Sequence, residues 1–309
     1  MVAIPCCSAI GAISVRPGDL CSGVNQRLDW GTTWFEQRMK AASTGENRFA
    51  ADARRYAEYL ETPEGRLRAD LTFANLEDFL PAAPRATSLS ALDLGCGTGA
   101  AAIRLARLGI HATLLDSSTA MLDLAERAIV EAGVSDRATV KHGDASRLAT
   151  LFPGEAFDFI LCHNVLEFVE DPDAVVCAAA RLLRDSSSIL SVLVRNQAGE
   201  VLKAALVLGD LAAAERDLNE DWGQESLYGG KVRLFRPEGV ERMLKNAGLV
   251  AAQSAVRVMM DYLPPQISRS AEYDRIFALE RRLGKRQEFF GMGRYLQYLA
   301  RRAEPAGAV

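Results

Sequence analysis

Residues 92–99 read LDLGCGTG, and this stretch decides the fold class of the chain. A short apolar run ends in three glycines at a spacing of two, and a helical pattern begins at Ala100. Glycine suits such a loop because the backbone must turn through dihedral angles that other residues avoid and must let a ligand approach closely. The first turn of the following helix offers free N–H groups. We therefore expect a strand, a ligand-binding glycine loop and a helix.

Short apolar segments alternate with helical patterns after this loop. We expect strands at 89–94, 111–115, 138–142, 157–162, 189–195, 249–261 and 294–299, and helices at 100–108, 119–131, 171–184, 237–248 and 271–282. Such alternation is typical of a parallel sheet covered on both faces. The sequence therefore predicts an α/β fold: a doubly wound, Rossmann-like sheet of seven mostly parallel strands with helices on both faces.

Three segments lie outside this alternation. Residues 1–45 are rich in Gly, Ser and Thr and lack periodicity, so we expect a loosely ordered leader. Residues 46–84 have a helical pattern, and we expect N-terminal helices that cover the site at the glycine loop. Within a main domain at 85–309, residues 197–235 are expected to form a helical insertion that ends in a loop at 228–231.

Composition excludes several classes of protein. Hydrophobic residues make up 49% of the 309 residues, which excludes a wholly disordered chain. The 36 Lys and Arg against 40 Asp and Glu give a net charge of −4, unlike a protein whose main task is coating nucleic acid. We see no apolar run of the ~18–20 residues that span a bilayer and no secretory signal. The six cysteines lack metal-binding spacing, so we expect a cytoplasmic protein without membrane contact or metal.

An acidic residue indicates which ligand the glycine loop binds. Asp116 lies seventeen residues after Gly99 at the end of the second strand, where a carboxylate can bind the two hydroxyls of a ribose. The spacing G-x-G-x-G departs from the dinucleotide pattern G-x-G-x-x-G, which disfavours a nicotinamide dehydrogenase. Asp93 before the loop repels a pyrophosphate but attracts an ammonium group. Together these residues favour S-adenosylmethionine as cofactor; a tight glycine turn without a ligand is the alternative.

The motif LDLGCGTG resembles the first motif of the class I S-adenosylmethionine-dependent methyltransferases, and the likeness covers residues 85–262. Asp144 and Ala145 follow the third strand, where members of that family bind the adenine. For Asp144 a simple turn at the end of the strand is the alternative. The segment after the fourth strand, beginning at His163, is expected to lie where the methyl group is transferred.

Four further segments narrow the resemblance. Residues 163–172 (HNVLEFVEDP), 62–68 (TPEGRLR), 256–263 (VRVMMDYL) and 293–295 (GRY) resemble the transfer-RNA methyltransferases that esterify 5-carboxymethoxyuridine at the wobble position. This likeness extends over residues 56–300. It implies methyl transfer to a carboxylate, with an anticodon nucleotide of transfer RNA or a small acidic metabolite as acceptor.

The resemblance also implies the cofactor residues. Arg68 would bind the carboxylate of S-adenosylmethionine, because a guanidinium fork meets a carboxylate in two parallel hydrogen bonds; a surface arginine is the alternative. The remaining candidates line the same expected pocket: Asp93, Gly95, Cys96, Gly97, Asp116, Ser117, Asp144, Ala145 and His163.

The acceptor is expected to meet Arg257, Tyr262, Arg294 and Tyr295. On a regular strand Arg257 and Tyr262 face opposite sides, so both reach one pocket only if the chain bends near Met260. An exposed edge-strand arginine is the alternative. The family carries a histidine where this chain has Met260, which cannot donate a hydrogen bond to an anion. That departure, and few basic residues in the insertion, favour a small acidic acceptor over transfer RNA.

The expected chemistry requires no general base, because a carboxylate is ionised at neutral pH. Catalysis then depends on alignment of the reacting atoms. Transfer to a phenol or an amine would instead need a base such as His163. Two alternatives remain open: a small-molecule O- or N-methyltransferase of secondary metabolism, and a regulatory module that binds S-adenosylmethionine without catalysis.

Overall fold

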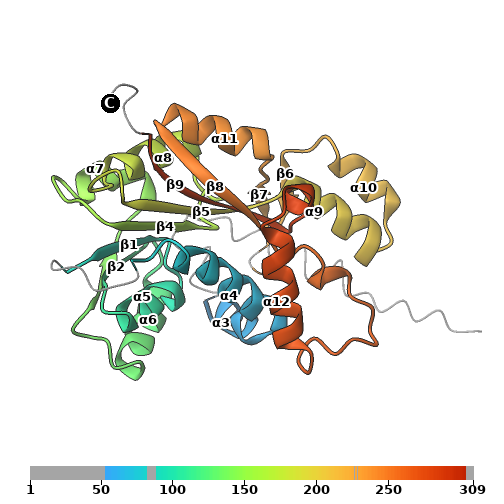
Figure 1. Ribbon diagram of the computed structural model, residues 1–309, viewed down its shortest axis with the longest axis horizontal. Coiled ribbons are helices and arrows are strands. Elements are labelled where there is room, and N and C mark those ends of the chain that lie inside the picture. The colour runs from blue at the N-terminus through green and yellow to red at the C-terminus, as the bar shows by residue number, and fades with distance from the viewer. Residues whose placement is uncertain (1–52, 82–87, 226, 228, 304–309) are drawn as a thin grey trace, which may run out of the picture. The chain divides into compact units, whose positions relative to one another are not determined.

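A seven-stranded sheet with the order β3-β2-β1-β4-β5-β9-β8 forms the centre of the fold (Figure 1). The computed structural model describes residues 53–81, 88–225, 227 and 229–303. The strands are β1 Ser90–Leu94, β2 His111–Asp116, β3 Ala138–His142, β4 Phe159–His163, β5 Ile189–Arg195, β8 Leu249–Val256 and β9 Tyr295–Arg302. Strands β1 to β5 pair in parallel, and β9 runs antiparallel between β5 and β8. The predicted fold class is confirmed.

Helices cover both faces of the sheet (Figure 1). On one face lie α7 Leu148–Leu151, α8 Pro172–Arg181 and α11 Pro237–Asn246; on the other lie α4 Pro63–Glu77, α5 Ala100–Arg107, α6 Thr119–Glu131 and α12 Tyr273–Gly284. The packing of strand β4 explains why its first four residues, 159–162, are apolar. Ile160 and Cys162 pack in the core cluster with α8, whereas Phe159 and Leu161 pack in the cluster with α4 and α5. Both faces of the strand are buried, as expected for a parallel sheet.

The N-terminal helices α3 Ala53–Glu61 and α4 meet at a tight corner. The Thr62 side chain accepts a hydrogen bond from Gly65 N at 3.1 Å, and Pro63 occupies the first turn of α4, where its missing N–H costs nothing. A Cβ atom on Gly65 would lie 2.0 Å from the carbonyl oxygen of Tyr59, so only glycine allows this approach. The predicted leader, 1–45, lies outside the described residues.

The insertion is only partly helical. It contains α9 Gln197–Leu202, a π-helical turn at Lys203–Val207 and α10 Leu211–Asp217. Two antiparallel strands follow, β6 Trp222–Gln224 and β7 Lys231–Arg233. The prediction of a helical segment ending in a loop was therefore incomplete at its C-terminal end. The Arg233 guanidinium lies 4.8 Å from the centre of the Trp222 ring, and this cross-strand contact helps to hold the pair together.

The strand predicted at 249–261 is shorter than expected. Strand β8 ends at Val256, because Arg257 has a φ of +61°, in the left-handed region that breaks a strand. A 3₁₀ turn at Met260–Tyr262 follows. A short helix, α13 Gln287–Phe290, then connects α12 to β9.

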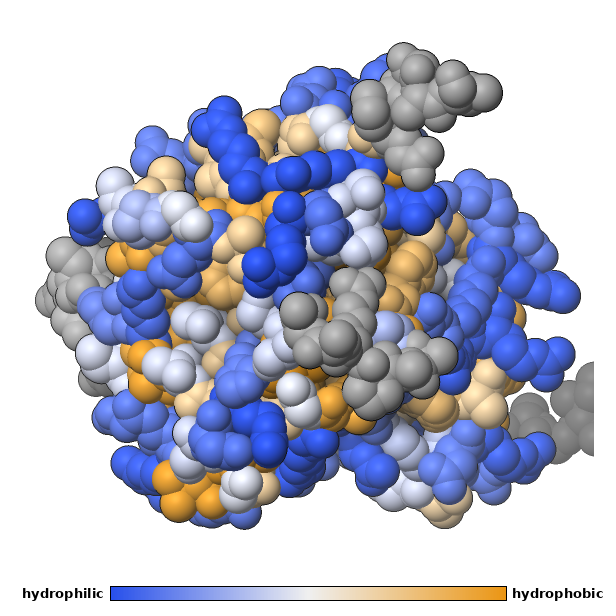
Figure 2. All heavy atoms as spheres, turned by 60° about the vertical axis from the view of Figure 1, so that its left-hand side comes forward, coloured by the Kyte–Doolittle hydropathy of each residue, from blue (hydrophilic) through white to orange (hydrophobic). Residues whose placement is uncertain are grey.

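Neither a membrane span nor a metal centre is found in the described ranges. No helix there is long and apolar enough to cross a bilayer. No three His, Cys, Asp or Glu side chains gather there as metal ligands either. Hydrophilic residues cover much of the face shown in Figure 2, with hydrophobic residues between them.

Candidate active site

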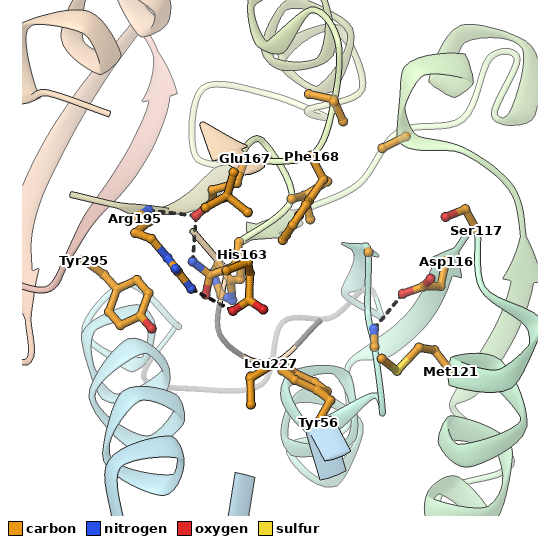
Figure 3. Close-up of a pocket in the computed structure, with 18 of the residues that line it drawn as sticks. Tyr56, Asp116, Ser117, Met121, His163, Glu167, Phe168, Arg195, Leu227 and Tyr295 are labelled. Carbon is orange, nitrogen blue, oxygen red and sulfur yellow. Dashed lines mark hydrogen bonds and ion pairs between the residues drawn. The ribbon is translucent and has the colours of Figure 1, made fainter. Parts of the chain in front are cut away.

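A cavity of about 620 Å³ opens at the carboxyl end of the parallel strands. This volume is typical of a site for a ligand of cofactor size (~300–1,000 Å³). Strands β2 and β3 lie on one side of β1, and strands β4 and β5 lie on the other. The strand order therefore reverses at β1, and doubly wound sheets bind ligands at such a reversal. In Figure 3 Asp116 lies on one side of the cavity, and Arg195 and Tyr295 lie on the other.

The glycine loop after β1 presents bare backbone to this cavity. Gly95 and Gly97 have φ values of +60° and +53°, which disfavour any side chain. A Cβ atom on Gly95 would lie 2.6 Å from Val165 Cγ2, and one on Gly97 would lie 3.0 Å from the Tyr56 ring. Both glycines are therefore required by backbone conformation and by close approach.

Asp116 holds the glycine loop and faces the cavity. Its Oδ2 accepts a hydrogen bond from Gly97 N at 2.8 Å, and its Oδ1 accepts one from Ser118 N at 2.9 Å. Burial raises the pKa of Asp116, and these backbone hydrogen bonds oppose the shift. Each oxygen retains a lone pair, so the carboxylate can accept hydrogen bonds from two neighbouring hydroxyls.

Arg68 of α4 is a buried cation that lines the cavity, 8% exposed. Its Nη1 donates to Asn164 Oδ1 and its Nη2 donates to Tyr56 OH, both at 3.0 Å. The guanidinium also lies 5.1 Å from the centre of the Tyr59 ring. No carboxylate pairs with it within the described part of the chain. Because a buried charge without a counter-ion is costly, Arg68 is suited to bind an anionic ligand.

Asp93 and Cys96 line a separate cavity of about 70 Å³ that shares Arg68, Gly95 and His163 with the larger one. Burial and the nearby Asp116 raise the pKa of Asp93 to about 7. Burial raises the pKa of the Cys96 thiol well above its usual range, and the nearby carboxylates of Asp93 and Asp116 add to the effect, so the thiol stays protonated. These two predicted residues therefore adjoin the larger cavity rather than line it.

The other predicted cofactor residues, Ser117, Asp144, Ala145 and His163, line the larger cavity. Asp144 also caps the 3₁₀ turn that follows it, since its Oδ1 accepts a hydrogen bond from Ser146 N at 2.7 Å. Asp144 can therefore cap the turn and also contact a ligand in the cavity.

His163 is neutral. Burial and the nearby Arg68 lower its pKa to about 3. Its Nε2 lies 2.8 Å from Ser191 Oγ, which already accepts a hydrogen bond from Gln297 Nε2 at 3.2 Å. The Ser191 hydroxyl and His163 Nε2 therefore form one hydrogen bond in which either group can be the donor. A histidine of such low basicity is a hydrogen-bonding residue and not a general base at neutral pH.

Basic side chains line the other end of the cavity, which we name the acceptor end. They are Arg195, Lys203, Arg257 and Arg294. Arg257 forms an ion pair with Asp261 and donates to Tyr59 OH at 3.0 Å. Arg294 pairs with Glu200 at 2.8 Å. Arg195 lies 3.2 Å from Glu225 and 3.5 Å from Glu200, so each of the three arginines is neutralised by a carboxylate.

Of the predicted acceptor residues, the fold brings Arg257, Arg294 and Tyr295 to the cavity but not Tyr262. Asp261 lines the wall instead, and the Tyr262 hydroxyl is buried without a hydrogen-bond partner in the described residues. The predicted bend exists, but it begins at Arg257 rather than near Met260. Arg257 is 5% exposed, which excludes an exposed edge-strand arginine.

A buried glutamate that sequence reasoning missed holds this bend. Glu280 of α12 is fully buried and accepts hydrogen bonds from three successive backbone N–H groups, Val258 at 2.6 Å, Met259 at 3.0 Å and Met260 at 2.7 Å. In the sequence it is one acid among several in an amphipathic helix, and no local pattern distinguishes it. Its contacts show that it fixes the backbone that carries Arg257 and Asp261 into the cavity.

Tyr295 lies at the acceptor end, on the side of the cavity opposite Asp116 (Figure 3). Burial raises the pKa of its hydroxyl, but four arginines, Arg68, Arg195, Arg257 and Arg294, together lower it to about 8. The neighbouring Tyr59 is affected in the opposite direction, since burial and Tyr295 raise its pKa to about 12. The local field of the site is therefore positive despite the acidic partners.

Comparison with known proteins agrees with this geometry. A family model described as a methyltransferase domain matches residues 92–190. The chain is also 30% identical over 250 residues to the tRNA 5-carboxymethoxyuridine methyltransferase of Escherichia coli (strain K12), which covers 79% of this chain and 91% of the relative. The chain belongs to the class I S-adenosylmethionine-dependent methyltransferases. This methyltransferase uses S-adenosylmethionine as its cofactor.

Other similar proteins are methyltransferases whose names give different acceptors. The chain is 31% identical over 166 residues to the ubiquinone biosynthesis O-methyltransferase of Aromatoleum aromaticum, which covers 52% of this chain and 64% of the relative. The magnesium protoporphyrin IX methyltransferase of Synechocystis, solved with bound SAH, has a TM-score of 0.55 and 16% identity, covering 84% and 98% of the two chains. A possible histamine N-methyltransferase of Thermotoga maritima has a TM-score of 0.54 and 17% identity, covering 84% and 99%. At these identities the two structures show the fold alone.

Proposed function

We propose that this methyltransferase transfers a methyl group from S-adenosylmethionine to a carboxylate oxygen of an acidic acceptor. The observation that carries the proposal is the charge at the acceptor end. Four cations line it. The three arginines pair with Glu200, Glu225 and Asp261, and Glu167 accepts a hydrogen bond from the backbone N–H of Arg195, whereas Lys203 has no carboxylate partner among the described residues. A partly buried cation without a carboxylate partner favours an anionic acceptor.

The end of the larger cavity opposite the acceptor end has residues suited to bind S-adenosylmethionine. We propose that Arg68 binds the methionine carboxylate, that Asp116 binds the ribose hydroxyls and that the bare backbone of Gly95 and Gly97 lies against the cofactor. The buried guanidinium without an acid and the lone pairs of Asp116 support this placement. Ser117, Asp144, Ala145 and His163 complete the proposed pocket, while Asp93 and Cys96 support it from the small cavity.

The residues of the site contribute alignment and the exclusion of water. S-adenosylmethionine, when bound, supplies an electrophilic methyl group on a positively charged sulfur. Val165, Phe168 and Val169 line the cavity and offer apolar surface, and Phe168 lies between its two ends in Figure 3. An apolar surround keeps water from competing with the acceptor oxygen, and a fixed acceptor converts a bimolecular reaction into one within a complex.

A phenol or amine acceptor fits this site less well. Such an acceptor must lose a proton, and His163, with a pKa of about 3, is too weak a base to take it at neutral pH. A carboxylate needs no base. The name of the Escherichia coli relative makes transfer RNA carrying 5-carboxymethoxyuridine the first acceptor to test, and small acidic metabolites form the second group. We propose a cytoplasmic enzyme, which would meet both groups.

The test uses S-adenosylmethionine with a labelled methyl group and two substrate pools, bulk transfer RNA and small acidic metabolites. Each product is then treated with mild alkali, which releases the methyl group of an ester as methanol but leaves methyl ethers and methylamines intact. We expect alkali-labile label in one pool. Label that resists alkali, or no transfer to either pool, would overturn the proposal.

A further inference from the structure

Lys203 differs from the other cations at the acceptor end. Each arginine there has a carboxylate partner, whereas the Lys203 ammonium has no hydrogen bond or ion pair with any described residue. The side chain is partly buried and lines the cavity. Burial lowers its pKa, and Arg294 and Arg195 add to the effect, while the carboxylates of Glu200 and Asp261 oppose it without forming an ion pair. Of the four cations at the acceptor end, Lys203 is therefore the one without a carboxylate partner among the described residues.

The backbone at Lys203 is also unusual. Residues Lys203–Val207 form a π-helical turn at the end of α9, and the Lys203 carbonyl accepts a hydrogen bond from Leu208 N at 3.1 Å. Single π turns are uncommon in helices and recur at functional sites. Here the turn lies in the insertion and begins at the residue that reaches the cavity.

We propose that Lys203 binds the acidic group of the acceptor and thereby distinguishes the acid from its neutral methyl ester. This inference rests on the proposed carboxylate methylation. A guanidinium fork binds both oxygens of a carboxylate, whereas an ammonium is a point charge that can bind one oxygen and leave the other exposed to the methyl group. The arginines, already paired with acids, then shape the wall around the acceptor.

The charge change during the reaction determines which kinetic constant Lys203 affects. The acceptor oxygen donates an electron pair to the methyl carbon while the bond from carbon to sulfur breaks, and its electron pair stays on sulfur. The carboxylate therefore loses its charge, and no proton moves. An ion pair with Lys203 is strongest before the reaction and absent in the ester, so it favours substrate binding and product release without accelerating the chemical step.

The decisive variant is Lys203→Met, which keeps the length of the side chain and removes its charge. We expect the KM for the acidic acceptor to rise about 10- to 100-fold, as for a lost hydrogen bond to a charged group, with kcat unchanged or higher. Lys203→Arg should recover part of the lost affinity. The matched control is Lys245→Met, an exposed lysine on α11, which should behave as wild type. The dissociation constant for S-adenosylhomocysteine, measured by calorimetry, should not change in any variant.

A second measurement separates this role from a structural one and from a contact with a phosphate. The purified methyl ester product is added as an inhibitor, and its inhibition constant is compared with the KM of the acid. Wild type should prefer the acid, and Lys203→Met should bind the two about equally. A wild-type KM in Lys203→Met, or an unchanged preference for the acid, would overturn the role of Lys203 while leaving carboxylate methylation in place. Label that appears only in alkali-stable products overturns both.

Discussion

The hydrogen bonds of Glu280 lead to a prediction about how the bend after β8 is held. We consider Glu280→Gln, a change that keeps the shape of the side chain. Glu280 Oε1 accepts from Met259 N and Met260 N, and Oε2 accepts from Val258 N. In the amide variant one oxygen can still serve two N–H groups, but an NH₂ group faces the third. One buried donor is then left without an acceptor.

The magnitude follows from these contacts. An unsatisfied buried N–H costs ~1–3 kcal/mol, and exchanging charged for neutral acceptors weakens each of the two remaining hydrogen bonds by roughly 1 kcal/mol. Burial raises the pKa of Glu280, because a buried charge is costly. The neutral amide avoids this cost, which offsets part of the loss. We therefore expect a net destabilisation of about 2 kcal/mol, or a fall of roughly 4–8 °C in Tm.

Urea and thermal unfolding followed by circular dichroism measure the loss of stability. Calorimetry measures the affinity for S-adenosylhomocysteine. The KM for the acceptor should rise, because Glu280 fixes the backbone of Arg257, while the cofactor affinity should stay the same. Glu272→Gln is the matched control, since the side chain of this glutamate is 40% exposed and pairs, among the described residues, with the exposed Arg275 at 2.8 Å. Equal stability of Glu280→Gln and Glu272→Gln would refute the reasoning.

Four further predictions concern the cavity itself. Arg68→Lys should weaken binding of S-adenosylhomocysteine roughly 10- to 100-fold through loss of the guanidinium fork, while the exposed Arg66→Lys should not; equal affinities in calorimetry would argue against the assignment. Asp116→Ala should weaken the same binding by a similar factor, measured in a variant whose circular dichroism matches wild type. The folded protein keeps a proton on Asp93 up to about pH 7, whereas the unfolded chain loses it near 3.8, so stability should fall as pH rises between these values. Asp93→Asn should therefore raise Tm at pH 8 but not at pH 4, and an equal gain at both would contradict the shift. Ultraviolet titration should show one tyrosine ionising near pH 8 that is missing in Tyr295→Phe, and this variant should still methylate a carboxylate, which needs no base.

Local sequence patterns determined most of the parallel half of the fold. Helix α6 Thr119–Glu131 and strands β3 and β5 have the predicted bounds. Their signals are local: Ser118 caps α6 by accepting from Met121 N at 3.3 Å, and β5 (ILSVLVR) is a short, mostly apolar run. The glycine loop and Asp116 could be predicted for the same reason, because a parallel sheet brings the carboxyl ends of its strands to one edge.

The acceptor end could be predicted only in part. Arg257, Arg294 and Tyr295 were expected there, but nothing in the sequence shows that Asp261 and Glu200 neutralise the two arginines. Glu200 lies 94 residues before Arg294 in the chain. A contact between residues so far apart leaves no periodic trace in either segment.

The sequence by itself determined the class of fold, the cofactor and the residues at the glycine loop, because each depends on neighbours along the chain or on the common edge of a parallel sheet. Only the tertiary structure decided which cations at the acceptor end are paired, where β8 ends and which side chain holds the bend. Glu280 reaches three backbone N–H groups about twenty residues away, and Arg257 takes a left-handed conformation that its own sequence does not favour. Packing of α12 against β8 fixes both, and with them the position of the charges that the acceptor meets.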